Sequence, residues 1–311
     1  MTILYADPVF LRHDTGAHPE NANRLRAITA RLEQSGLVPR CRAGTFAPLD
    51  ADQLRLVHAP AVVQLAHRVA TQGGGRIDAD TVVCPESYDV ALAAAGAASA
   101  AVDAVLDGTD PTALCLVRPP GHHATRGRSM GFCLFNNVAL AARRARQRGL
   151  ERVLIVDWDV HHGNGTQDVF DDDPSVTFFS VHRFGHGFYP GTGAADETGT
   201  GPGLGTTFNA PLPFGIKRSQ YHAAFRAVLE TAADRCKPEL VLLSAGFDAH
   251  AQDPIGSLGL ETEDFAALTD LVRDVARTHA GGRLVSCLEG GYNVRVLAEC
   301  VAVHLERLLA D

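Results

Sequence analysis

Two aspartates and two histidines directly follow a short apolar segment near the middle of the chain. Residues 153–156 (VLIV) predict a strand buried on both faces, and Asp157, Asp159, His161 and His162 come immediately after it. Because side chains alternate along extended backbone, Asp159 and His161 point the same way and can bind one metal ion through an oxygen and a nitrogen. The structural alternative is a capped strand end, in which Asp157 accepts loop amides and the histidines are solvated.

The same arrangement of a short apolar segment, a reactive turn and a helical segment occurs four times. The apolar segments are residues 113–117 before RPPGHHA, 153–156 before DWDVHHGNG, 240–243 before SAGFDAH and 284–288 before EGGYN. Alternating strands and helices predict parallel βαβ units, and the site of an open parallel sheet lies at the carboxyl ends of its strands. The reactive side chains that should therefore meet at one edge are His122, His123, Asp159, His161, Asp248 and Tyr292.

The residue types at this edge suit metal-assisted hydrolysis. Asp159, His161 and Asp248 would supply three ligands to zinc and leave its fourth position to water or substrate. The two adjacent histidines after RPPG could provide a general base, and Tyr292 could donate its hydroxyl to a carbonyl oxygen as negative charge develops there. Alternatively, the histidines bond loop carbonyls and the tyrosine is a half-buried core ring. Metal, base and hydroxyl donor together predict hydrolysis of an amide or ester.

The elements that must position these residues fit one large α/β domain. The chain has 311 residues, of which 46% are hydrophobic and 21% charged, and no change in composition divides it, so we expect a single domain over residues 1–311. The start MTILYADPVF lacks the pattern of a signal peptide, which predicts a soluble, cytoplasmic protein. The seven cysteines include no CxxC pair, and the net charge of −8 argues against a nucleic-acid surface while favouring cationic substrates.

The helices that should cover the sheet follow from their apolar spacing. They are residues 23–35, 87–106, 220–236, 261–279 and 294–309. We expect the 87–106 helix, which is rich in alanine, to pack closely on the sheet, and we expect His222, His279 and His304 on helix surfaces. In the glycine-rich segment 199–205 no strand leads in and no helix follows, so neither a dinucleotide nor a phosphate loop is indicated.

Six motifs carry a resemblance to a known family. They are RPPGHHA at 118–124, GFCLFNN at 131–137, DWDVHHGNGTQ at 157–167, YPGTG at 189–193, SAGFDAH at 244–250 and EGGYN at 289–293. In this order they resemble the zinc-dependent histone deacetylases and acetylpolyamine amidohydrolases, in particular the class II-like bacterial members. The resemblance extends from about Pro19 to Asn293. It implies the arginase-deacetylase fold, a three-layer αβα architecture around a mainly parallel eight-stranded sheet.

The resemblance also implies roles for the residues at the strand ends. One zinc ion per chain would be held by Asp159, His161 and Asp248. His123 would be the proton shuttle, and Tyr292 would polarise the scissile carbonyl. These roles agree with the chemistry expected from the residue types alone.

The residue beside the second histidine of the pair differs from that in part of the family. His122 would be held by Asp157 and would contribute mainly charge. Beside His123, Asn164 stands where class I enzymes carry an aspartate. Because an amide cannot carry the charge that raises a neighbouring pKa, the pKa of His123 should be set differently here.

A narrow substrate tunnel and a potassium ion are further implications of the resemblance. Phe132, Tyr189 and Ile255 would form the walls of the tunnel, and Gly131 would allow close approach of the acyl-lysine stem. Tyr189 stands where the family commonly has phenylalanine. Potassium is usual in the family behind the zinc site; the residues that would surround it are Asp157, Asp159, His161 and Ser180.

The sequence therefore predicts a zinc amidohydrolase that removes acetyl or another short acyl group from acyl-lysine or a related acylated amine. An acetylpolyamine amidohydrolase and a short-chain acyl esterase would use the same site. An arginase-like enzyme would need a second aspartate-rich metal site, and a binding module could dispense with Tyr292 and the histidine pair. We expect a small amine or acyl-lysine peptide as the partner, with no nucleic acid or membrane; the oligomeric state stays open.

The position of one residue bears on the choice between lysine and polyamine substrates. A polyamine-selective enzyme needs a carboxylate at the tunnel mouth to pair with the distal ammonium. Ile255 occupies the position that we align with that carboxylate, which favours acetyl-lysine. Glu86 and Asp253 are the acidic residues that we expect near the rim instead.

Overall fold

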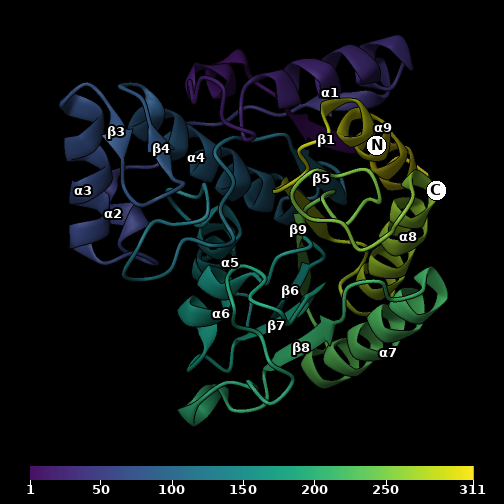
Figure 1. The fold of residues 1–311 in the computed structure, drawn as a ribbon. Helices are drawn as coiled ribbons and strands as arrows, with labels where there is room; N and C mark the ends of the chain where they lie inside the picture. Colours follow the sequence, from purple (N-terminus) through teal and green to yellow (C-terminus); the bar gives the residue numbers. More distant parts are fainter. Residues whose placement is uncertain (311) are drawn as a thin grey trace.

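The computed structural model describes residues 1–310, and its centre is one eight-stranded sheet between two layers of helices (Figure 1). The strands of this sheet, in spatial order, are β2 (Cys41–Ala43), β1 (Thr2–Tyr5), β5 (Thr112–Cys115), β10 (Leu284–Leu288), β9 (Leu240–Ala245), β6 (Val153–Asp157), β7 (Val176–Arg183) and β8 (Thr207–Leu212). Every neighbouring pair in it is parallel. A separate hairpin joins β3 (Gly75–Arg76) to β4 (Val82–Val83). The three-layer fold with a mainly parallel sheet is confirmed.

The central strands are apolar because helices cover both of their faces. All residues of β5, β6, β9 and β10 are buried, as continuous Val, Leu and Ile runs predict for parallel strands. In the register of the sheet, Asp157 at the end of β6 pairs with Ser244 of β9 and Ser180 of β7. The four reactive turns therefore leave the sheet from the same edge.

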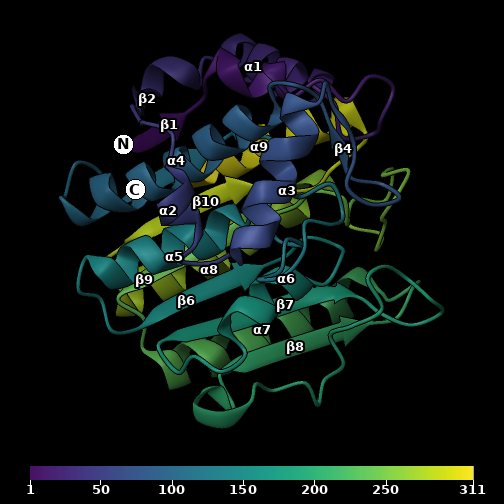
Figure 2. The ribbon, with the colours of Figure 1, turned by 90° about the vertical axis from the view of Figure 1, so that its left-hand side faces the viewer.

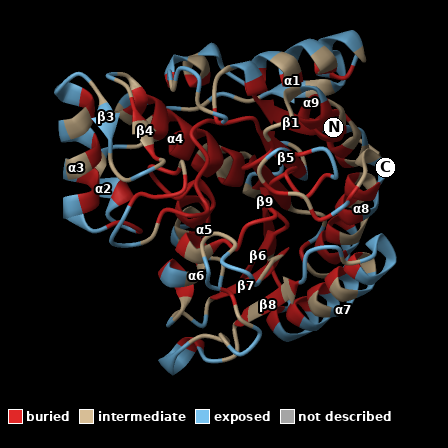
Figure 3. Ribbon diagram, in the orientation of Figure 1, coloured by how far each residue is buried: buried red, intermediate tan, exposed pale blue. Residues whose placement is uncertain are grey.

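Helices form one layer on each face of the sheet, and Figure 2 views it from the side of α3 to α6. The helices are α1 (Asn23–Gln34), α2 (Ala51–Leu54), α3 (Pro60–Thr71), α4 (Ser87–Leu106), α5 (Asn137–Gln147), α6 (Asn164–Phe170), α7 (Arg218–Cys236), α8 (Thr262–His279) and α9 (Val294–Leu308). One layer contains α4, α5 and α6, with α3 packed outside α4. The opposite layer contains α7 and α8, followed by α9 and α1. Buried residues concentrate in the sheet and on the inner sides of these helices (Figure 3).

The alanine-rich helix α4 packs closely, as predicted, against β5 and β10. A Cβ at Gly96 would lie 2.1 Å from the carbonyl oxygen of Ala47. Only glycine therefore fits where the segment that contains Ala47 crosses α4. Its length and composition alone would allow α4 to cross a membrane, but 67% of its most apolar window is buried in the fold. This burial is that of a core helix.

One expectation about the helix surfaces is wrong. His304 in α9 is fully buried, with Nδ1 2.7 Å from Thr269 Oγ1 and Nε2 2.9 Å from Ser286 Oγ. The error arises because α9 is covered by α8 and α1, and His304 also reaches Ser286 of the central strand β10, so this side of the helix is interior too. Burial lowers the pKa of His304 to about 3, which keeps the imidazole neutral. His222 and His279 are partly exposed, as expected.

Candidate metal centre and active site

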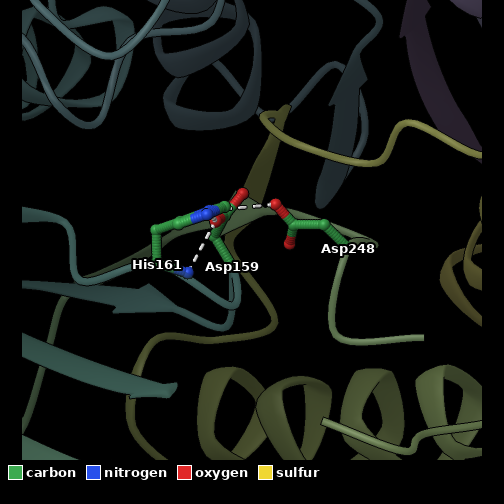
Figure 4. A group of neighbouring side chains, drawn as sticks. All are labelled: Asp159, His161 and Asp248. Atoms are coloured by element: carbon green, nitrogen blue, oxygen red, sulfur yellow. Dashed lines mark hydrogen bonds and ion pairs between the residues drawn. The ribbon is translucent and has the colours of Figure 1, made fainter. Parts of the chain in front are cut away.

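The three predicted metal ligands lie together at the carboxyl ends of β6 and β9 (Figure 4). Asp159 Oδ1 lies 3.0 Å from His161 Nδ1, and Asp248 Oδ2 lies 3.2 Å from the same nitrogen. One donor atom from each of the three residues lies within 4.8 Å of the others. All three residues are buried, so the cluster is formed by the fold.

The donor atoms of this cluster fit a divalent metal ion. Among residues 1–310, Asp248 Oδ2 is a buried oxygen that accepts no hydrogen bond. Burial and the neighbouring charge of Asp159 raise the pKa of Asp248, because two carboxylates are confined here. A divalent cation would neutralise this pair, and two oxygens with one imidazole nitrogen leave a coordination position free. The cluster can therefore hold a metal ion with an open site.

The carboxylates also bind backbone amides of neighbouring loops. Asp159 Oδ2 accepts a hydrogen bond from the amide of Gly290 at 2.9 Å, and Asp248 Oδ1 accepts one from Val160 at 2.9 Å. Asp157 Oδ1 accepts the amide of Asp159 at 3.0 Å. These bonds tie the loop after β6 to the loops after β9 and β10. The geometry of the cluster is thus fixed without the ion.

The two adjacent histidines have opposite electrostatic environments. Burial lowers the pKa of His122, but the carboxylates of Asp159 and Asp157 outweigh it and raise the pKa well above the usual value. The Nδ1 atom of His122 lies 3.0 Å from Asp157 Oδ2. Burial and the positive charge of His122 lower the pKa of His123 well below the usual value. His122 is therefore a cation and His123 a neutral base at pH 7.

Asn164 orients the neutral histidine. Its Oδ1 lies 2.7 Å from Nδ1 of His123. The resemblance to the family predicted that Asn164 would lie beside this histidine. Because a carbonyl oxygen only accepts, Nδ1 of His123 carries the proton and Nε2 is free to take one. The amide nitrogen of Asn164 donates to the sulfur of Met130 at 3.5 Å, which fixes the orientation of the amide.

Tyr292 lies at the end of the loop that follows β10. Its ring lies 5.1 Å from the guanidinium carbon of Arg24 and 5.7 Å from the ring of Phe132. Burial raises the pKa of Tyr292 well above its usual value, and the carboxylates of Asp248 and Asp159 act in the same direction. The phenol therefore stays protonated and keeps a hydrogen that it can donate.

Three of the residues predicted to line a substrate tunnel lie beside His123 or Tyr292. Gly131 has φ +57°, and a Cβ there would lie 2.5 Å from Cδ2 of His123. The ring of Tyr189 packs edge-on against His123 at 5.0 Å. Phe132 and Tyr189 thus lie next to the predicted catalytic residues. Ile255 lies half-buried on a separate loop, and its place in the wall stays a prediction.

Asp253 does not offer the free carboxylate that we expected at the rim. Its residue is 8% exposed, and Oδ1 accepts the amides of Ile255 and Gly256 at 2.9 and 3.0 Å. Oδ2 accepts the amide of Tyr292 at 2.7 Å. The carboxylate is turned inward to organise its loop. Glu86 has an exposed side chain, 3.9 Å from the guanidinium of Arg12.

Two aromatic contacts were not predicted from the sequence. Phe188 stacks parallel to the ring of His161, with centroids 5.0 Å apart and an interplanar angle of 4°. The ring of His18 packs edge-on against Phe132 at 4.5 Å. The signal for Phe188 was its position directly before Tyr189 in the YPGTG motif. His18 carried no signal, because 114 residues of sequence separate it from its partner.

A buried cluster of charged side chains lies next to the active-site loops. Arg118 donates to both oxygens of Glu20, and Arg24 donates to Oε1 of the same carboxylate at 3.0 Å. Arg24 also donates to the carbonyl oxygens of Gly291 at 2.7 Å and Glu289 at 2.5 Å. The cluster holds the loop that carries Tyr292.

Comparison with known proteins gives a consistent result. Residues 18–308 match the family described as the histone deacetylase domain. The chain is 45% identical to the polyamine deacetylase HDAC10 of Homo sapiens over 94% of its length, and 39% identical to a histone deacetylase-like amidohydrolase of Pseudomonas aeruginosa over 94%. It spans 45% of the human protein and 77% of the bacterial one. The crystal structure of the HDA15 HD domain covers 99% of this chain and is itself 88% covered, with 36% identity and a TM-score of 0.92.

Proposed function

The chain belongs to the histone deacetylase family, and on that premise we propose that it is a zinc-dependent amidohydrolase. It removes an acetyl or other short acyl group from the amine of acyl-lysine or a related acylated amine. The observation that carries the proposal is the buried cluster of Asp159, His161 and Asp248, with the ring of His123 5.8 Å from that of His161. Amide hydrolysis by this mechanism requires a metal site and a general base beside it.

Zinc is the metal that the donor set suits best. Two carboxylate oxygens and one imidazole nitrogen with an open fourth position are typical of catalytic zinc. When bound, zinc would polarise the substrate carbonyl and acidify a water. The register that places Ser180 beside Asp157, together with the family membership, supports a potassium ion behind the site.

Each residue around the metal cluster has its own role in the proposed reaction. His123 accepts a proton at Nε2, and the Nδ1 hydrogen bond to Asn164 holds the ring in place. His122 stays charged against Asp157 and stabilises negative charge in the transition state. The hydroxyl of Tyr292 donates to the carbonyl oxygen as it becomes an oxyanion. Gly131 and the rings of Phe132 and Tyr189 exclude water from the acyl-bearing stem.

Acyl-lysine is the substrate class that the rim favours. The carboxylate of Asp253 is bound to backbone amides and Ile255 carries no charge, so neither residue offers a free carboxylate to a distal ammonium. The similarity to a protein named polyamine deacetylase supports acetylpolyamines as the second candidate. A short-chain ester would be cleaved by the same groups.

Metal analysis and a substrate panel test this proposal. We expect one zinc ion per chain, loss of turnover with a chelator, and loss of both zinc and turnover in Asp248→Ala, because two ligands bind metal far more weakly than three. Full metal content in that variant would refute the ligand assignment. Liquid chromatography of an acetyl-lysine peptide, acetylputrescine, acetylspermidine and an acyl ester would rank the substrates. Hydrolysis of none of them would refute the function.

A further inference from the structure

A buried carboxylate outside the metal cluster joins two parts of the active site. Glu289 follows the last residue of β10 and is fully buried. Its Oε2 accepts hydrogen bonds from the amides of Gly121 at 2.7 Å and His122 at 3.2 Å. Its Oε1 accepts a hydrogen bond from Ser244 Oγ at 3.2 Å. In the described part of the chain, no lysine, arginine or histidine forms an ion pair with this carboxylate.

The backbone of the same residue is held on both sides. The amide of Glu289 donates to Ala245 at 3.0 Å, and its carbonyl oxygen accepts from Arg24. The amide of the next residue, Gly290, donates to the metal ligand Asp159. Glu289 is therefore fixed to the sheet, and its side chain reaches across to the turn that carries the catalytic histidines. Tyr292 lies three residues further along the same loop.

We propose that Glu289 is a positioning residue whose carboxylate holds the Gly121–His122 turn at a fixed distance from the loop of Tyr292. The proposal rests on the function proposed above, in which His123 and Tyr292 act on the same carbonyl group. Those two residues are carried by different strands, β5 and β10, and Glu289 is the side chain that connects the two turns directly. A buried carboxylate is costly, and this connection is what it provides.

The length of the side chain matters more than its charge. The turn is packed tightly against the start of α5, since a Cβ at Gly121 would lie 2.5 Å from the amide nitrogen of Asn137. The side chain of His122 pairs with Asp157, whose Oδ2 lies 3.0 Å from its Nδ1, whereas Glu289 binds the backbone amide of His122. An amide of the same length could accept both hydrogen bonds with its oxygen and donate to Ser244 with its nitrogen.

Two substitutions at Glu289 separate the effect of side-chain length from the effect of side-chain charge. Glu289→Asp keeps the charge but shortens the side chain by one methylene, so the two amides lose their acceptor or the turn shifts. A displacement of about 1 Å at a reacting group lowers turnover by up to about 10²-fold, and we expect kcat to fall about ten- to a hundredfold with KM within threefold of wild type. Glu289→Gln keeps the reach, and we expect kcat within about threefold of wild type.

Amide hydrogen exchange measures the same contact without any substrate. In Glu289→Asp the peptide covering residues 118–124 should exchange faster than in wild type, and in Glu289→Gln it should remain protected. The zinc content of both variants should equal that of wild type. If the wild-type enzyme failed to hydrolyse the substrate panel, the proposed function would fall, while the exchange result would still decide whether the carboxylate holds the turn.

Glu239 offers a matched control at the opposite end of the sheet. Its Oε2 accepts the amides of Glu151 and Arg152 at 2.7 and 2.9 Å, the same two-amide arrangement just before β9. Glu239→Asp should speed exchange around residues 151–152 and leave kcat unchanged. A Glu289→Asp enzyme with wild-type kcat, or a Glu289→Gln enzyme as slow as a Glu289→Asp one, would overturn the proposal. Should Glu289→Asp fail to fold, a Glu289→Gln enzyme with kcat more than tenfold below wild type would overturn the proposal.

Discussion

Replacing Asn164 with aspartate should shift the pH dependence of the enzyme to higher pH. The amide oxygen lies 2.7 Å from Nδ1 of His123, and the substitution changes it to a carboxylate of nearly the same shape. A carboxylate there favours the imidazolium form, so it raises the pKa of His123, which burial and the charge of His122 otherwise lower. Below the new pKa a smaller fraction of His123 is neutral. The acid limb of kcat/KM therefore moves upward.

The size of the shift follows from the separation of the charges. Two unit charges about 4 Å apart interact by about 4 kcal/mol at an effective dielectric constant of 20. At 1.36 kcal/mol per pKa unit this corresponds to about three units. Asn164 lines a polar surface cavity of about 570 Å³, so solvent screens part of the interaction. We expect a shift of about one to two units.

The assay is kcat/KM of wild type and Asn164→Asp from pH 5 to 10 with one acetyl-lysine peptide. Gln147→Glu, at the exposed end of α5, adds the same charge far from the site and should leave the profile unchanged. Zinc content should be equal in all three proteins. An acid limb that stays within about 0.3 units of wild type in a folded, zinc-loaded Asn164→Asp enzyme would show that His123 is not the titrating base.

Three further predictions concern the roles of single side chains. Tyr292→Phe should keep its zinc and lower kcat about 10²-fold, the worth of one oxyanion donor; wild-type turnover would exclude that role. Ile255→Glu should shift the ratio of kcat/KM for acetylspermidine over acetyl-lysine about tenfold toward the polyamine, and an unchanged ratio would place Ile255 outside the tunnel mouth. Glu20→Gln should cost about 3–5 kcal/mol in urea unfolding at pH 7, because it leaves Arg118 buried without its partner. Arg118 and Arg24 hold the pKa of Glu20 near 2, below its ordinary 4.5, so the cost should be full above pH 4.5 and vanish as the pH falls toward 2.

The strand ends and the metal cluster could be predicted because their signals are local. Each reactive turn follows an apolar run, and parallel topology then brings the turns together without any knowledge of packing. This reasoning placed Asp159, His161 and Asp248 within bonding distance of one another. It also predicted α4 to the residue, because an alanine-rich run between Ser87 and Leu106 has no other stable environment.

The remaining features depend on contacts between distant segments. Arg118 and Glu20 are 98 residues apart, and nothing near either residue shows that the other neutralises it. The inward turn of Asp253 depends on the amide of Tyr292, which belongs to another strand end. His304 looked like a surface residue because the helical pattern describes one covered face, whereas α9 is covered on more than one side.

The double use of the metal-binding carboxylates has an evolutionary consequence. Asp159 and Asp248 each accept a hydrogen bond from a loop amide, so they are needed for loop order as well as for holding a metal ion. The hydroxyl of Tyr292 does not hold a loop in place in this way. A descendant that lost catalysis while keeping the fold should therefore lose the tyrosine hydroxyl early and retain both aspartates. In such a lineage the presence of both aspartates would reflect the need for loop structure and would not be evidence of activity.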